Sequence, residues 1–300
     1  MRSVTSPADL DADRILPWVL RVLWLALPFT LGTQIGDALE GTSRPVQLTG
    51  TVGAWTLWGI GLLLTLIPHT LTLSPLRVLG PATLGVSIWA ALADGVSGWT
   101  VVALTVTAAL AAVVLSPSIG GTWINGSSYG DERRVPLRPP GAMVAGPIPL
   151  AWAAVVTSVA AGALLLAAKQ WILGVVVSLI AAGLVFVVGR ALHQLTQRWL
   201  VFVPAGLVVH DHLSVGDPVL FKRTAVAAFG PALADTTAAD LTVGATGLAL
   251  EILVKEPVEI GYRPQPGAQP TVREITGVAI APSRPGVVLD EAKRRNITVA

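Results

Sequence analysis

Long apolar runs separated by short polar segments dominate the first two thirds of the chain. Each run has 18 to 20 residues. At about 1.5 Å per residue, a helix of that length crosses a hydrocarbon core of about 30 Å. The pattern therefore predicts six transmembrane helices, at about residues 17–36, 51–68, 76–93, 98–115, 149–168 and 171–189.

Two of the intervening features make structural predictions of their own. Pro28 lies in the middle of the first run, where it should kink the helix because it lacks an N–H and its ring clashes with the preceding turn. The longest loop, 116–147, is rich in glycine and proline, and this density favours irregular backbone.

The fifth and sixth runs are separated only by Lys169 and Gln170, so they should form a tight antiparallel hairpin. Gly174, Ser178 and Ala182 recur at every fourth residue of the sixth run. A stripe of small side chains lets two helices approach closely, and we interpret this one as packing inside the hairpin.

From Trp199 onward the pattern changes to short apolar alternations divided by turn residues. The change predicts a small barrel or a strongly bent sheet that ends in a helix at 284–295. We therefore divide the chain into a cytoplasmic tail (1–14), a six-helix transmembrane domain (15–192) and a soluble β-rich domain (193–300). The expected strands are 199–204, 207–210, 218–221, 247–255, 257–262 and 277–281.

Composition agrees with a membrane protein and excludes several kinds of chemistry. The chain is 53% hydrophobic and 13% charged, whereas soluble chains are about 25% charged. It has no cysteine, so disulfides, thiolate metal sites and cysteine catalysis are excluded. After Trp199 there are nine Lys and Arg against ten Asp and Glu, so no basic domain suggests nucleic-acid binding.

The positive charges of the loops predict the orientation in the plasma membrane. With both termini in the cytoplasm, only Arg44 and Lys169 lie outside, and positively charged loops prefer the inside. The inner set comprises Arg2, Arg14, Arg21, Arg77, Arg133, Arg134, Arg138, Arg190 and Arg198.

Three stretches of the last third are similar to bacterial pleckstrin-homology-like (PH-like) domains that follow membrane helices. Residues 198–209 resemble the opening hairpin, 218–229 the next strand, and 280–289 the last strand leading into the terminal helix. With the six runs, the whole chain resembles actinobacterial multi-pass membrane proteins. The resemblance implies a membrane location and contacts with protein or lipid, and it implies no catalytic residues.

Two groups of polar residues are candidates for a metal site or an ion site. His210 and His212 would share one face of a strand and could reach one metal, but two ligands are too few, so we interpret them as a polar strand end. Asp37, Glu40 and Asp94 lie at the edges of spans, where ordinary interfacial residues are expected. We therefore predict no catalytic, cofactor-binding or metal-binding residue.

Two binding hypotheses remain open. Arg133, Arg134 and Arg138 in the long loop could contact anionic lipid headgroups, although a solvated loop is the simpler interpretation. A path for a neutral solute could be lined by polar residues of the spans, namely Gln34, Thr65, Thr105, Thr107 and Ser178.

The pattern favours a non-enzymatic integral membrane protein that acts as an accessory subunit, scaffold or regulator. In this hypothesis the six helices anchor the protein, and residues 199–300 bind a protein partner. The alternative is a transporter or channel component for a neutral or lipidic solute. It is weakened because no inverted repeat with broken helices is visible.

The orientation is testable with a reporter. A β-lactamase fused after Lys169 is expected to lie outside the membrane and to be active. The positive charges before the fifth run and after the sixth run should keep those two ends of the hairpin inside. An inactive fusion would reverse the assignment.

Overall fold

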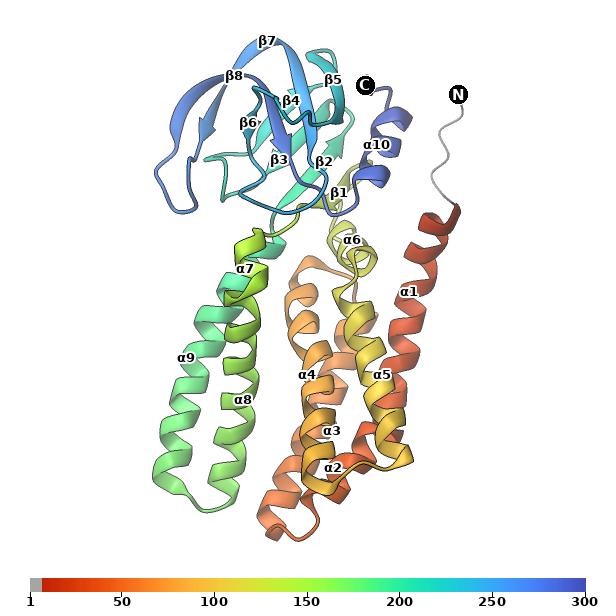
Figure 1. Cartoon of the computed structure of the whole chain (residues 1–300), viewed down its shortest axis with the longest axis vertical. Helices are drawn as coiled ribbons and strands as arrows, with labels where there is room; N and C mark the ends of the chain where they lie inside the picture. The colour runs from red at the N-terminus through yellow and green to blue at the C-terminus, as the bar shows by residue number, and fades with distance from the viewer. Residues whose placement is uncertain (1–6) are drawn as a thin grey trace. The chain divides into compact units, whose positions relative to one another are not determined.

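The computed structural model describes residues 7–300 and divides them into two compact units (Figure 1). The helical unit comprises residues 13–123 and 148–193. The β-domain comprises residues 124–147 and 194–300. Residues 7–12 are grouped with the β-domain as well, so the chain passes from one unit to the other more than once.

Six helical stretches within residues 7–300 are long and apolar enough to cross a membrane, as the sequence predicted. The first is the stretch Ala12–Leu39, which contains most of α1 and all of α2. The helices concerned are α1 (Pro7–Ala26), α2 (Leu31–Leu39), α3 (Arg44–Leu66), α4 (Thr70–Asp94), α5 (Gly98–Leu115), α8 (Pro147–Ala167) and α9 (Trp171–Thr196).

Pro28 interrupts the first helical stretch, as predicted. A short 3-10 helix, η1 (Leu27–Phe29), separates α1 from α2. Proline cannot donate the backbone hydrogen bond that an α-helix needs at this position, so the helix changes its hydrogen-bonding pattern there. The Thr30 N–H accordingly donates to the carbonyl of Leu27 at 3.2 Å.

Helices α8 and α9 form the predicted antiparallel hairpin, and small residues bring them together. A Cβ added to Gly162 would lie 2.7 Å from Ser178 Oγ, and one added to Gly174 would lie 2.8 Å from Leu166 Cδ2. The stripe on α9 therefore serves packing inside the hairpin. The hairpin also contacts α4, because Trp152 donates its indole N–H to the carbonyl of Val78 at 3.0 Å.

The long loop is not irregular throughout, and this expectation was wrong. It contains α6 (Pro117–Asn125), the strand β1 (Arg133–Pro136) and the short helix α7 (Gly141–Ala145). Strand β1 pairs antiparallel with β2 (Trp199–Val203). Val135 and Leu137, two residues apart, are both buried, and burial of this apolar pair favours a strand despite the nearby prolines.

The segment that follows β1 is hydrogen-bonded on two sides. The Leu137 N–H donates to the carbonyl of Arg198, and the Arg138 N–H donates to the carbonyl of Ala281. On the same edge, the Ser283 N–H donates to the carbonyl of Pro136. The β-domain is therefore assembled from 124–147 as well as from the C-terminal third, with the α8–α9 hairpin inserted between them in sequence.

The strands of the β-domain form two four-stranded sheets within the described residues, in the orders β1-β2-β3-β4 and β5-β7-β8-β6. β7 is one continuous strand with an irregularity between Leu253 and Val258, where the sequence suggested two strands. The remaining strands are β3 (Gly206–His210), β4 (Val219–Lys222), β5 (Val226–Pro231), β6 (Ala239–Asp240), β7 (Leu250–Tyr262) and β8 (Thr271–Ile280), followed by the predicted terminal helix α10 (Pro285–Arg294).

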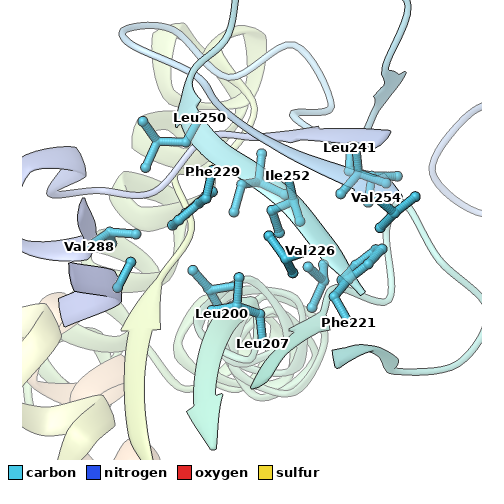
Figure 2. Packing of buried hydrophobic residues seen from close by; sticks show 14 of the residues in the cluster. Leu200, Leu207, Phe221, Val226, Phe229, Leu241, Leu250, Ile252, Val254 and Val288 are labelled. Atoms are coloured by element: carbon cyan, nitrogen blue, oxygen red, sulfur yellow. The ribbon is translucent and has the colours of Figure 1, made fainter. Parts of the chain in front are cut away.

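A single apolar core lies between the two sheets and α10 (Figure 2). Phe221 and Leu200 come from the first sheet, Phe229 and Ile252 from the second, and Val288 from the helix. All five are nearly or completely buried. The alternation of apolar residues that predicted strands after Trp199 is therefore the inward-facing half of this core.

The pairing of β1 with β2 predicts a specific disulfide. Because the chain lacks cysteine, the pair Arg134→Cys with Val201→Cys would be the only thiols. These positions are directly opposite in the register, where the Cα separation of about 4.5–5.5 Å suits a disulfide. Mild oxidation should therefore link them with high yield.

The matched control is Arg134→Cys with Val208→Cys, because Val208 lies one strand further on, opposite Val201. With a protease site placed at Lys169, the linked pair should hold the two fragments together on a non-reducing gel. Equal linking of both pairs, or of neither, would contradict the observed register.

Candidate functional site: an arginine-rich cleft in the β-domain

Arg198 and Asp211 form a buried ion pair at the start of the C-terminal part of the β-domain. Arg198 Nε and Nη2 donate to the two carboxylate oxygens of Asp211, each at 2.7 Å. Both side chains are at most 1% exposed. The remaining guanidinium nitrogen, Nη1, donates to the carbonyl of Arg138 at 2.8 Å. One side chain thus joins the beginning of β2, the end of β3 and the segment after β1.

The hairpin register explains why these two residues meet. Trp199 pairs with His210, so the preceding Arg198 lies opposite the following Asp211 at the open end of the hairpin. Arg198 was predicted only as a positive charge on the cytoplasmic side, and its pairing with Asp211 was not predicted. The turn at Ala205 and Gly206, read together with strand pairing, would have been sufficient to find it.

The two histidines do not lie on one strand. β3 ends at His210, and His212 lies in the turn that follows. The expectation that both side chains lie on one face of a strand was therefore wrong. His210 stacks on Trp199 with ring centroids 5.1 Å apart, and its Nδ1 is 3.0 Å from the carbonyl of Gln197. The pKa of His212 is lowered, mainly because the imidazole is partly buried. The negative charge of Asp211 acts in the opposite direction.

A second buried carboxylate, Glu291 on α10, is surrounded by three arginines. Arg133 Nη1 donates to Glu291 Oε2 at 2.9 Å, and Arg295 Nε donates to Oε1 at 2.6 Å. Arg294 Nη2 also contacts Oε2. Partial burial and then repulsion from Arg133 and Arg295 lower the pKa of Arg294. Within residues 7–300, three guanidinium groups are thus gathered around one buried carboxylate.

A cleft of about 210 Å³ adjoins this cluster and includes Arg295 in its lining. A second arginine, Arg223, enters from the loop after β4, where its backbone N–H donates to the carbonyl of Ala205. The Arg223 side chain is exposed, and within residues 7–300 no partner for its guanidinium is found. The other lining residues include Val203, Pro204, Asn296 and Ile297. The cleft therefore combines apolar walls with two guanidinium groups, a chemistry suited to an anion.

The three arginines of the long loop take part in the fold of the β-domain. Arg133 binds Glu291, and Arg134 pairs with Glu132 while lying over the ring of Trp199. Arg138 Nη1 donates to the carbonyl of Thr246 at 2.8 Å. Contact of these residues with lipid headgroups would compete with these bonds, and it stays a prediction.

Polar residues in the helical unit are mostly satisfied by internal hydrogen bonds. Ser87 Oγ donates to Gln34 Oε1 at 2.9 Å, and both side chains are buried. Thr65 and Thr107 are also buried, and each hydroxyl donates to a carbonyl of its own helix. The other two candidates for a solute path differ, because Thr105 is exposed and Ser178 faces Gly162 in the hairpin.

Two of the three interfacial carboxylates lie beside the Gln34 and Ser87 pair. Asp37 and Asp94, together with Gln34, line a cavity of about 30 Å³. Glu40 follows α2 and is exposed. A cavity of this volume accommodates about one or two water molecules.

Among residues 7–300, no three His, Asp or Glu side chains are grouped so that they could hold a metal ion. Comparisons with protein-family models, with curated proteins and with solved structures gave no match to the chain. The similarity to PH-like domains and to actinobacterial membrane proteins therefore stays a prediction.

The buried ion pair makes a quantitative prediction. Arg198→Met should lower the free energy of unfolding of the β-domain by about 3–5 kcal/mol, because it leaves the Asp211 carboxylate buried without its partner. Urea unfolding of the detergent-solubilised protein, followed by pulse proteolysis, measures the change.

The matched control is Arg190→Met, since Arg190 is exposed on α9 and should change stability little. The double change Arg198→Met with Asp211→Leu should recover part of the loss, because no charge is then left unpaired. An Arg198→Met protein as stable as the parent would show that the pair contributes nothing.

Proposed function

We propose that this chain is a non-enzymatic integral membrane protein of the plasma membrane that acts as an accessory subunit, scaffold or regulator. The proposed orientation has both termini in the cytoplasm. In this proposal the six helices hold the protein in the bilayer, and the β-domain binds a protein partner. The partner segment is acidic and enters the cleft lined by Arg223 and Arg295.

The observation that carries the proposal is the construction of the β-domain from two segments. β1 precedes the α8–α9 hairpin and β2 follows it, yet the two strands are paired. Both ends of the hairpin are therefore continuous with one folded domain. The chain enters and leaves the hairpin from this one domain, and in our proposal this continuity lets binding of a partner act on the helices.

The charge of the cleft supports an acidic partner. Glu291 is already shared by three arginines, and the Arg223 guanidinium has no partner within the described residues. Arginine binds carboxylates through two parallel hydrogen bonds, and it is enriched in protein interfaces. The apolar walls formed by Val203, Pro204 and Ile297 add area for the aliphatic part of a bound segment.

The alternative is a transporter or channel component for a neutral or lipidic solute. The observation in its favour is the buried Gln34 and Ser87 pair, which adjoins the small cavity at Asp37 and Asp94. This pair is hydrogen-bonded to itself, and the cavity is no larger than a few water molecules. We therefore rank the alternative second.

Charge reversal in the cleft tests the first proposal. Tagged full-length protein, purified in mild detergent from its own cells, should retain a stoichiometric protein partner. Arg223→Glu should reduce that partner by about tenfold or more, since it replaces a charge-assisted bond with repulsion. Point substitution is preferable to deletion of 199–300, which would also remove the strand that pairs with β1.

Arg273→Glu is the control, because Arg273 is an exposed arginine on β8 that does not line the cleft. It should leave the partner bound. Full retention by Arg223→Glu would contradict the proposal. So would a preparation that carries only a small molecule, particularly if Gln34→Leu abolished function at unchanged abundance, which would favour transport.

A further inference from the structure

Arg77 on α4 is a cation without a counter-ion inside the helical unit. Its Nε is buried and has no hydrogen-bond partner, and the described residues provide no ion pair for its guanidinium. A buried guanidinium nitrogen without a hydrogen-bond partner is costly. Arg77 as a whole is half-buried, so a ligand can still reach the rest of the group. Comparable groups in the same unit are satisfied, since Arg21 Nε donates to the carbonyl of Thr65 and Trp123 Nε1 to that of Leu64.

The guanidinium of Arg77 is packed against the first turns of α6. A Cβ added to Gly120, the fourth residue of α6, would lie 2.4 Å from Arg77 Nη2. Glycine at this position is therefore what makes room for the guanidinium. The amino-terminal turns of a helix carry a partial positive charge, so the cation lies where the backbone also repels it. The N–H groups of Ile119 and Gly120 already donate to the hydroxyl and the carbonyl of Ser116, so the guanidinium is the main group that an anion would stabilise.

The depth of Arg77 suggests where the anion comes from. Arg77 is seven residues into α4, or about 10 Å from the end of the helix at Thr70. α4 has 25 residues, so it is about 37 Å long and exceeds a hydrocarbon core of about 30 Å. With the helix centred, the backbone of Arg77 lies about 7 Å inside the boundary between hydrocarbon and headgroups, and a long arginine side chain can extend toward that boundary. Phospholipid phosphates lie near this level, and arginine binds phosphate through two parallel hydrogen bonds.

We propose that Arg77 and the amino-terminal turns of α6 form a binding site for the phosphate of an anionic phospholipid headgroup. The ligand completes the charge balance of the helical unit, and it is separate from the acidic partner proposed for the β-domain. A soluble phosphate ester shares the same chemistry, so the test must distinguish a lipid from free phosphate.

The experiment measures thermal stability of the full-length protein in a neutral detergent with added lipid. Phosphatidylglycerol should raise the melting temperature of the parent protein more than phosphatidylcholine does. Arg77→Gln should weaken the apparent affinity for phosphatidylglycerol by about tenfold or more, the effect of losing a charge-assisted bond. Arg190→Gln, which removes an exposed arginine of the same unit, should respond like the parent.

Gly120→Ala is a second variant that keeps every charge. Its methyl group would displace the Arg77 guanidinium, so binding of phosphatidylglycerol should fall although alanine is favourable in a helix. Arg77→Met should be at least as stable as the parent in neutral detergent without lipid, because no internal partner is lost.

The outcomes separate clearly. An effect of millimolar inorganic phosphate equal to that of phosphatidylglycerol supports the site and identifies a soluble ligand. An equal response of Arg77→Gln and the parent to phosphatidylglycerol would overturn the proposal. A large loss of stability in Arg77→Met without lipid would also overturn it, since Arg77 would then have a partner within the protein.

Discussion

The buried pair of Arg198 and Asp211 is the interaction on which the β-domain depends. The carboxylate takes two of the guanidinium's hydrogen bonds, and the carbonyl of Arg138 takes a third. An isolated charge at this depth would destabilise the fold, so each partner requires the other. α9 ends at Thr196 and β2 begins at Trp199, so the pair lies where the chain changes from helix to sheet.

Charge balance is reached differently in the two units. In the β-domain, the buried carboxylates of Asp211 and Glu291 are paired with arginines of the chain, and two arginines line a cleft. In the helical unit, the Nε of Arg77 is buried without a hydrogen-bond partner among the described residues. The cleft in the β-domain fits the acidic partner proposed above. The environment of Arg77 fits the phospholipid phosphate proposed for the helical unit.

The helices and the main strands could be predicted from the sequence because their signals are local. Runs of apolar residues identify the spans, and alternation identifies β2, β3 and the core of β7. β1 was missed because Val135 and Leu137 are too few to form a pattern among prolines. The Arg198 and Asp211 pair follows from hairpin register, so it could have been inferred. The pairs of Glu291 with Arg294 and Arg295 likewise follow from helical spacing. Its pair with Arg133 could not be predicted, because only the tertiary fold brings these two residues together.

The insertion of the α8–α9 hairpin within the β-domain has a consequence for biosynthesis. β1 leaves the ribosome about 60 residues before its partner β2, with the two apolar helices of the hairpin between them. At about 5–20 residues per second, β1 waits several seconds with an unpaired edge. The sheet that contains β1 and β2 cannot be completed until the hairpin has been synthesised, so its completion requires that α8 and α9 have already been made.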